Sequence, residues 1–140
     1  DGQIAISRFD YLRQDDAKNF LFNKSESMQG FGVSTKSPLD IASMRSPHYE
    51  IIMRVNDSQK APLYFNVTCG QNCQGTVELP PMDLDTWNKV SVPVSCLKKD
   101  GLDISTIQIR ALFFTQGPIN FDLHSVAIKN GVTSDLKVSC

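Results

Sequence analysis

HYEIIMRV, residues 48–55, is the stretch that decides the fold class of this chain. Every second residue of it, starting at Tyr49, is apolar, whereas His48, Glu50 and Arg54 fall on the alternate positions. Successive side chains of a strand point to opposite faces, so this period of two predicts a β-strand with one buried face.

Similar alternation recurs in residues 63–69, 90–94, 107–113 and 119–128. In the last of these the phase slips at His124, which is typical of a strand that carries a bulge. No long segment has an apolar stripe with a period of 3.6 residues, so we expect helices to be minor. Short strands separated by Gly, Pro, Asn and Asp turns therefore predict an all-β fold, read here as one β-sandwich.

Other segments are less decisive. Residues 4–16 begin as an apolar-rich extended segment, and residues 17–22 fit a helical turn or a short strand equally well. Pro93 indicates a sheet edge or a bulge, because proline cannot donate to the hydrogen-bond ladder. We expect residues 1–129 to form a single module and residues 130–140 to form a C-terminal tail or a last loose strand.

Length and charge narrow the function classes. The 140 residues suit one domain, and the net charge is −1, from 14 basic and 15 acidic residues. The basic residues are scattered, so we expect neither nucleic-acid nor membrane binding. The chain carries no apolar run of transmembrane length and no signal-peptide pattern, so we expect a processed or excised chain.

Four cysteines bear on the compartment. Cys69 and Cys73 enclose Gly-Gln-Asn, which favours a tight turn and hence a disulfide. A metal site would need ligands beyond His48 and His124, and the spacing is not the Cys-x-x-Cys of redox motifs. A disulfide predicts an oxidising compartment. Cys96 and Cys140 form a second pair whose bonding the sequence leaves open.

The carboxylates offer little for catalysis. Sugar hydrolysis needs two carboxyl groups at a defined separation, one of them with a raised pKa. The candidates Glu50, Glu78, Asp83, Asp85 and Asp122 lie mostly in expected turns or on outer faces. There is no Gly-x-Ser-x-Gly motif and no phosphate-binding glycine loop, so we do not expect an enzyme.

The polar faces of the expected strands suit sugar hydroxyls better. Planar amide, guanidinium and carboxylate groups bind neighbouring hydroxyls bidentately, and an aromatic ring stacks on a pyranose. The candidate sugar-binding residues are Glu50, Arg54, Tyr64, Asn66, Gln108 and Arg110. They would share one surface if their strands are neighbours in one sheet. The alternative is an ordinary solvated face whose arginines pair with Glu50. Trp87 precedes a strongly alternating strand, and we expect it in the core.

A family resemblance rests on several motifs in order. They are SPLDI at 37–41, YEIIMRV at 49–55, CGQNCQGTV at 69–77, WNKVSVPVSCL at 87–97 and GLDIS at 101–105. With these motifs, residues 37–128 resemble the ExoP-type galactose-binding-like domain found at the C-terminus of many bacterial glycoside hydrolase family 3 enzymes. The chain departs from the usual pattern at Leu97, where an aromatic commonly stands, and in having Cys140.

The resemblance implies a jelly-roll sandwich appended to an exported β-glucosidase or β-1,4-glucan glucohydrolase, with the catalytic residues in other domains. It implies a periplasmic or extracellular location. Two functions remain open: weak binding of β-glucan oligosaccharides on a sheet face, or docking on the parent enzyme's catalytic domains without binding sugar. Ile52, Leu112 and Phe114, on the nominally polar side, keep docking open.

A structural calcium ion is the one cofactor that the resemblance raises. Many jelly-roll modules hold calcium between their first and last strands, and this ion prefers several oxygen ligands. Asp10 and Asp122 are the candidate ligands, with ordinary surface carboxylates as the alternative.

Overall fold

The computed structural model describes residues 4–9, 17–22, 29–34, 41–56, 62–70, 72–98, 101–105, 108–115, 119–131 and 136–140. The elements are β1 (Ile4–Phe9), β2 (Ala17–Phe22), β3 (Gln29–Ser34), β4 (Pro47–Val55), β5 (Tyr64–Gly70), β6 (Cys73–Glu78), β7 (Asn88–Pro93), α1 (Val94–Lys98), β8 (Gln108–Thr115), β9 (Ile119–Asn130) and β10 (Leu136–Lys137). Within these residues no helix has the length and apolar character that a membrane crossing needs.

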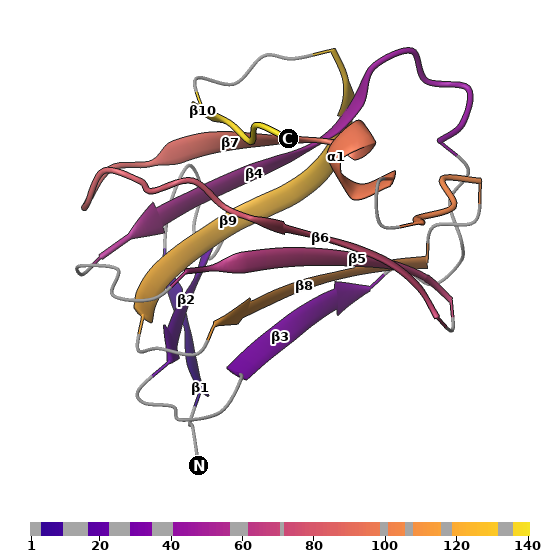
Figure 1. The fold of residues 1–140 in the computed structure, drawn as a ribbon. Coiled ribbons are helices and arrows are strands. Elements are labelled where there is room, and N and C mark those ends of the chain that lie inside the picture. Colours follow the sequence, from indigo (N-terminus) through magenta and orange to yellow (C-terminus); the bar gives the residue numbers. More distant parts are fainter. Residues whose placement is uncertain are drawn as a thin grey trace.

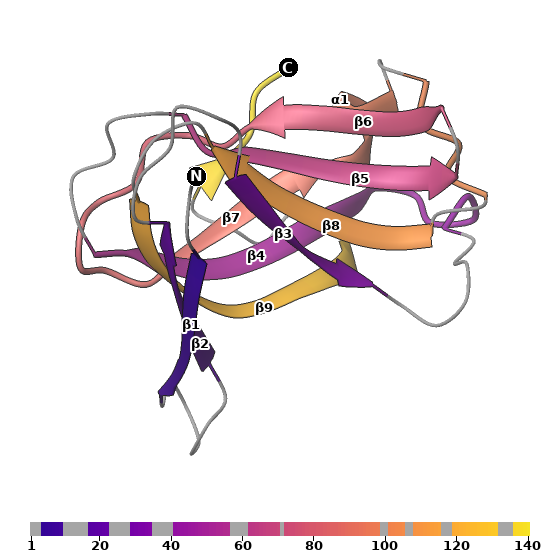
Figure 2. The same cartoon turned by 90° about the horizontal axis from the view of Figure 1, so that it is seen from below.

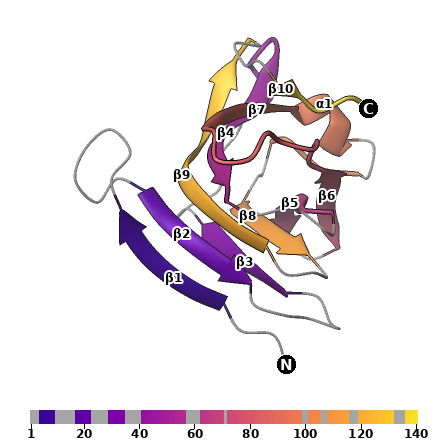
Figure 3. The ribbon, with the colours of Figure 1, turned by 90° about the vertical axis from the view of Figure 1, so that its left-hand side faces the viewer.

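The strands form two sheets. One has six strands in the order β1-β2-β9-β4-β7-β10, and the other has four in the order β3-β8-β5-β6. Figure 1 shows β4, β7 and β9 in one layer and β5, β6, β8 and β3 in the other, and Figure 2 shows the four-stranded sheet from below. In Figure 3, β1 and β2 continue the six-stranded sheet beyond β9. The predicted all-β sandwich is confirmed.

The core lies between the two sheets. Tyr49 and the other alternate apolar residues of β4 are fully buried, as the sequence pattern predicts. Four rings form a chain across the layers, with centroids 5.2 Å apart for Tyr49 and Phe65, 5.3 Å for Phe65 and Phe113, and 6.1 Å for Phe113 and Phe121. Burial also raises the pKa of the Tyr49 hydroxyl above its usual value. Because β4 and β9 belong to one sheet and β5 and β8 to the other, these rings join the sheets.

The predicted bulge is confirmed in β9. Ile52 of β4 pairs with Ser125, whereas the next residue, Met53, pairs with Leu123. His124 is thus the extra residue, and the inward positions of β9 change phase on either side of it.

The structure assigns several segments that the sequence left undecided. Residues 17–22 are a strand, and the described part of residues 4–16 is β1. Pro93 is the last residue of β7, opposite His48, and β10 pairs with β7 only at Val90 and Ser91. Pro93 therefore lies outside the part of β7 that pairs with β10, where its missing N–H removes no bond of that ladder. The tail contains a short strand in β10, while the boundary at residue 129 stays a prediction because β9 runs to Asn130.

The helix α1 covers one edge of the sandwich. Val94, Cys96 and Leu97 are its buried side chains, and it packs against β6. A Cβ atom on Gly75 of β6 would collide with the carbonyl oxygen of Leu97. Glycine at this position therefore allows the close approach of the helix to the edge strand.

Candidate functional site

The six candidate sugar-binding residues do not share one surface. Glu50 and Arg54 lie on β4 in the six-stranded sheet, whereas the other four lie on β5 and β8 in the four-stranded sheet. The condition for a shared surface, that these strands are neighbours in one sheet, is therefore not met. Alternation tells which face a residue lies on, but the pairing of strands depends on contacts between distant segments. Here the chain passes to the other sheet between β4 and β5.

Arg54 forms the most developed polar arrangement, on the side of β4 opposite the core. Its Nε and Nη2 groups donate hydrogen bonds to the same oxygen, Oδ2 of Asp122, at 2.8 and 2.5 Å. The two residues are directly paired across β4 and β9. The Asp122 side chain is 4% exposed and that of Arg54 is 32% exposed, so the carboxylate holds a guanidinium that still reaches the surface. Arg54 thus forms its ion pair with Asp122 of β9.

Trp87 completes this arrangement. The guanidinium carbon of Arg54 lies 5.0 Å from the centre of the Trp87 ring, which is within the range of a cation–π contact. Trp87 is half-buried and lies outside the core, so the prediction of a core tryptophan is wrong. Arg54, Asp122 and Trp87 are called the Arg54 cluster below.

A hollow of about 280 Å³ adjoins the Arg54 cluster. Its lining is mixed, with an aromatic ring, amide, hydroxyl and charged groups and two apolar residues: Pro81, Asp83, Thr86, Trp87, Asn88, Lys89 and Leu136. This space, called the Trp87 hollow below, is close to the lower end of the range of about 300–1,000 Å³ for ligand sites. Its lining suits a small polar ligand with one apolar face.

The turn before β7 sets the position of Trp87. Asp85 adopts a φ of 57°, in the left-handed region, and its N–H donates to the Val55 carbonyl at 2.8 Å. The Asn88 Nδ2 group donates to the Thr86 carbonyl at 2.8 Å, which closes the turn around Trp87. The regular alternation of β7 carried no sign of these contacts, because one lies within the preceding turn and the other joins the turn to β4.

The four-stranded sheet uses its polar residues differently. Asn66 is 4% exposed, and its Nδ2 group donates to Gln74 Oε1 at 3.3 Å and Thr76 Oγ1 at 2.7 Å. Its Oδ1 has no partner among the described residues. Tyr64 is half-buried and pairs in register with Glu78 on one side and Phe114 on the other. Asn66 is therefore part of the internal bonding of the sheet.

The remaining candidates are placed by their backbones or by partial burial. Gln108 pairs in register with Thr68, and Arg110 pairs with Ser34; their side chains lie outside the described residues. Glu50 is half-buried on β4, paired in register with Ser91 and Ala127.

The structure describes one of the two candidate calcium ligands. Asp10 lies outside the described residues, and Asp122 already accepts two hydrogen bonds from Arg54. A guanidinium this close repels a second cation, so Asp122 does not fit the ion well. Within the described part of the chain, no three His, Cys, Asp or Glu side chains gather as metal ligands would. Structural calcium stays a prediction.

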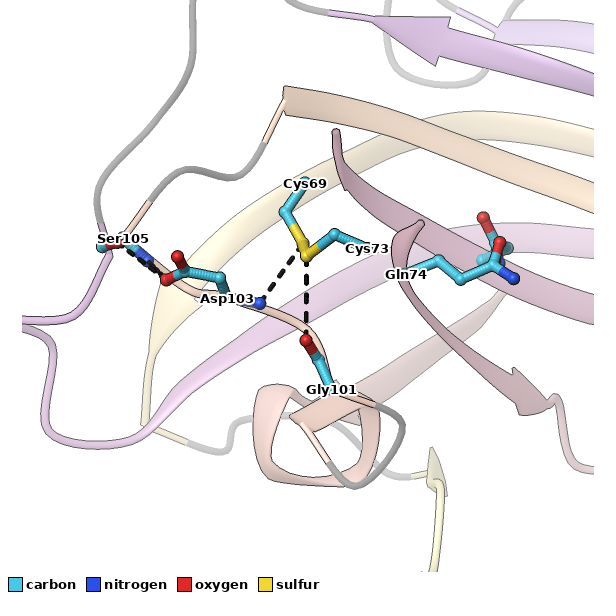
Figure 4. Close-up of a disulfide and its surroundings, with 7 residues drawn as sticks. Cys69, Cys73, Gln74, Gly101, Asp103 and Ser105 are labelled. Carbon is cyan, nitrogen blue, oxygen red and sulfur yellow. Dashed lines mark hydrogen bonds between the residues drawn. A yellow bond between two sulfur atoms is a disulfide. The ribbon is translucent and has the colours of Figure 1, made fainter. Parts of the chain in front are cut away.

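The structure has the disulfide predicted between Cys69 and Cys73 and a second disulfide whose pairing the sequence left open. Cys69 and Cys73 are bonded across the turn between β5 and β6, and Cys96 of α1 is bonded to Cys140. Figure 4 shows the first bridge beside the loop after α1, where the Asp103 N–H lies 3.3 Å from Cys69 Sγ. Ser105 closes that loop by donating from its N–H and Oγ to Asp103 Oδ1. Such bridges are typical of proteins from oxidising compartments.

Comparison with known proteins assigns this architecture. A family model described as a galactose-binding domain-like family, Exop_C, matches residues 1–128. No curated protein matches the sequence.

Solved structures share the fold at low sequence identity. The extra C-terminal domain of an exo-1,3/1,4-β-glucanase (ExoP) from a Pseudoalteromonas species has a TM-score of 0.68 at 15% identity, covering 98% of this chain and 76% of that one. The family 30 carbohydrate-binding module of a Clostridium thermocellum cellulosomal cellulase has a TM-score of 0.71 at 11% identity, covering 93% and 83%. An exo-β-agarase has a TM-score of 0.68 at 11% identity, with 96% of this chain covering 23% of that chain.

Proposed function

This chain belongs to the Exop_C family of galactose-binding-like domains, an accessory and non-catalytic type, and from that premise we propose a specific role. It is a carbohydrate-binding module of an exported β-glucan-degrading glycoside hydrolase of the β-glucosidase type. It binds β-glucan oligosaccharides weakly, on the outer face of the six-stranded sheet. Two disulfides support a periplasmic or extracellular location.

The Arg54 cluster is the observation that carries this proposal. A pyranose presents axial C–H bonds that pack on an aromatic ring, and its neighbouring hydroxyls accept hydrogen bonds from a planar guanidinium. Trp87 supplies the ring and Arg54 the guanidinium, which Asp122 fixes in orientation. A site that is already ordered loses less conformational entropy when it binds.

We expect binding to be weak. Trp87 is the chain's one tryptophan, and the hollow beside it is small. The free energy gained from this small contact area therefore exceeds the cost of ordering a sugar only slightly. A dissociation constant on the order of 1 mM is the expected result.

The test is a titration of the chain with cello- and laminari-oligosaccharides. Trp87 fluorescence reports on the Arg54 cluster directly, and NMR shifts of backbone amides locate the contact. Saturable changes at Arg54, Trp87 and Lys89 would support the proposal. Saturable shifts confined to Tyr64, Gln108 and Arg110 would move the site to the four-stranded sheet. No change at millimolar sugar, with the chain folded, would refute sugar binding.

The second candidate function is docking on the parent enzyme's catalytic domains without sugar. Leu84, in the loop before Trp87, is 46% exposed and is the one large hydrophobic residue with such exposure among the described side chains. Pro81 of the same loop is also exposed. A docking role would leave Trp87 unresponsive to sugars, and Leu84→Ser would weaken association with the catalytic domains in the full-length enzyme.

A further inference from the structure

A second, larger hollow lies beside the first. It measures about 570 Å³ and runs between the end of β6 and the C-terminal segment, and we call it the C-terminal groove. Its walls come from both sheets, since β6 is the edge of the four-stranded sheet and β10 the edge of the six-stranded sheet. This volume lies well inside the range of about 300–1,000 Å³ for ligand sites.

The two hollows are neighbours. Pro81 lines both of them. In β10, Leu136 lines the Trp87 hollow while the next residue, Lys137, lines the C-terminal groove. The shared residue Pro81 and the consecutive residues of β10 therefore place the two hollows next to one another.

The lining of the C-terminal groove suits a neutral, hydroxyl-rich chain. Leu79 and Val138 are buried and form apolar floor, whereas Thr76 and Ser139 bring hydroxyl groups. The charged side chains on its rim, Glu78 on β6 and Lys137 on β10, have opposite signs and are both exposed. Their charges offset one another, so the groove does not favour an ionic ligand of either sign.

The groove is held in shape by the C-terminal segment. The Val138 N–H donates to the Ser91 carbonyl at 2.9 Å, and β10 pairs in parallel with β7. The disulfide between Cys96 and Cys140, both of which line the groove, ties the end of the segment to α1. One wall of the groove therefore depends on a covalent bond between residues 44 positions apart.

We propose that the Trp87 hollow and the C-terminal groove together form one extended site that binds a β-glucan oligosaccharide along its chain, so that affinity rises with chain length. This inference rests on the proposed function and names the form of its ligand. One sugar unit packs on Trp87, and the following units cross Pro81 and lie between Glu78 and Lys137. A disaccharide reaches the first part of the site and a hexasaccharide reaches both.

The experiment compares a disaccharide and a hexasaccharide of the same linkage in titrations of the full chain, followed by Trp87 fluorescence and backbone NMR. We expect the hexasaccharide to bind about tenfold more tightly, with extra shifts at residues 76–78 and 137–139. The variant E78A/K137A, which alters two exposed side chains, should lose this gain and keep its affinity for the disaccharide. Lys129→Ala, an exposed lysine outside both hollows, is the matched control and should change neither affinity.

A second variant tests the wall of the C-terminal groove that the disulfide holds. In C96A/C140A the C-terminal segment is no longer tied to α1, and we expect the hexasaccharide to lose affinity while the disaccharide does not. Equal affinities of the two sugars for the unmodified chain, with no shifts at residues 137–139, would overturn the extended site and leave the proposed function standing. No response to either sugar would overturn both.

Discussion

The outer faces of the two sheets carry similar residue types but use them in opposite ways. On the six-stranded sheet, Arg54 is fixed by Asp122 and still reaches the surface beside Trp87. On the four-stranded sheet, Asn66 is buried, and its amide group donates hydrogen bonds to Gln74 and Thr76. A polar residue at an outward position of a strand is thus either exposed at the surface or buried and hydrogen-bonded within the sheet. Its neighbours decide which of the two it is.

This difference follows from reach. The arginine side chain is long enough to bond a partner on the next strand and keep part of its length in solvent. The asparagine side chain is short, so a partner on the next strand holds it close to the sheet surface, where it is buried. The two faces should therefore respond differently to substitution.

The largest effect on stability should come from the core between the two sheets. Phe65 is fully buried and contacts the rings of Tyr49 and Phe113. Phe65→Ala should lower the free energy of unfolding by about 3–5 kcal/mol, through lost burial and the cavity left behind. Chemical denaturation measures it, and Phe65→Leu, which leaves a smaller cavity, should cost less. An alanine variant as stable as the unmodified chain would contradict this core.

Arg54→Ala should have the next largest effect on stability. It leaves the Asp122 carboxylate, which is 4% exposed, without this ionic partner. Because Arg54 is itself partly exposed, water can enter its place, and we expect a loss of about 2 kcal/mol, below the roughly 3–5 kcal/mol of fully buried pairs. The same variant should abolish the Trp87 fluorescence response to oligosaccharide.

Arg54→Lys is the matched control for the guanidinium. It keeps the charge but not the planar fork, so the loss of stability should be smaller while sugar binding still weakens. Unchanged binding in both variants would remove Arg54 from the site.

The sequence predicted local features of the fold well. The alternation in residues 48–55 predicted both β4 and its buried face, and the phase slip predicted the bulge at His124. These features depend on side chains a few positions apart. The partners of β4 are β7 and β9, not β5 that follows it, and pairing of this kind depends on packing between distant segments. The predicted binding face therefore mixed residues from two sheets.

The candidate site was predicted only in part for the same reason. Arg54 was identified from its face, but its partner Asp122 lies 68 residues away. Trp87 was assigned to the core because the strand after it alternates strictly, whereas its position depends on the turn at Asp85. The pairing of Cys96 with Cys140 could not be read from spacing, since the two cysteines lie on α1 and on the segment after β10.

Asn66→Ala sharpens the contrast from the other side. It removes an amide that donates to Gln74 and Thr76, so we expect a loss of about 1–2 kcal/mol in the free energy of unfolding. Disaccharide binding at Trp87 should stay as it is, because none of these three residues lines the Trp87 hollow. Denaturation and Trp87 fluorescence measure the two quantities in the same sample. A variant that keeps its stability but loses sugar binding would reverse the roles assigned to the two faces.

Trp87→Leu should change stability least and binding most. The half-buried ring gives up a cation–π contact worth about 0.5–1 kcal/mol, and leucine retains part of its apolar contact. The sugar loses its stacking surface, so saturable NMR shifts at Arg54 and Lys89 should disappear, a readout that does not need the tryptophan itself. Trp87→Phe keeps a ring and should retain part of the binding. If Trp87→Leu binds as the unmodified chain does, the ring serves only to hold Arg54 in place. In that case a sugar would have to be bound by the guanidinium and its polar neighbours alone.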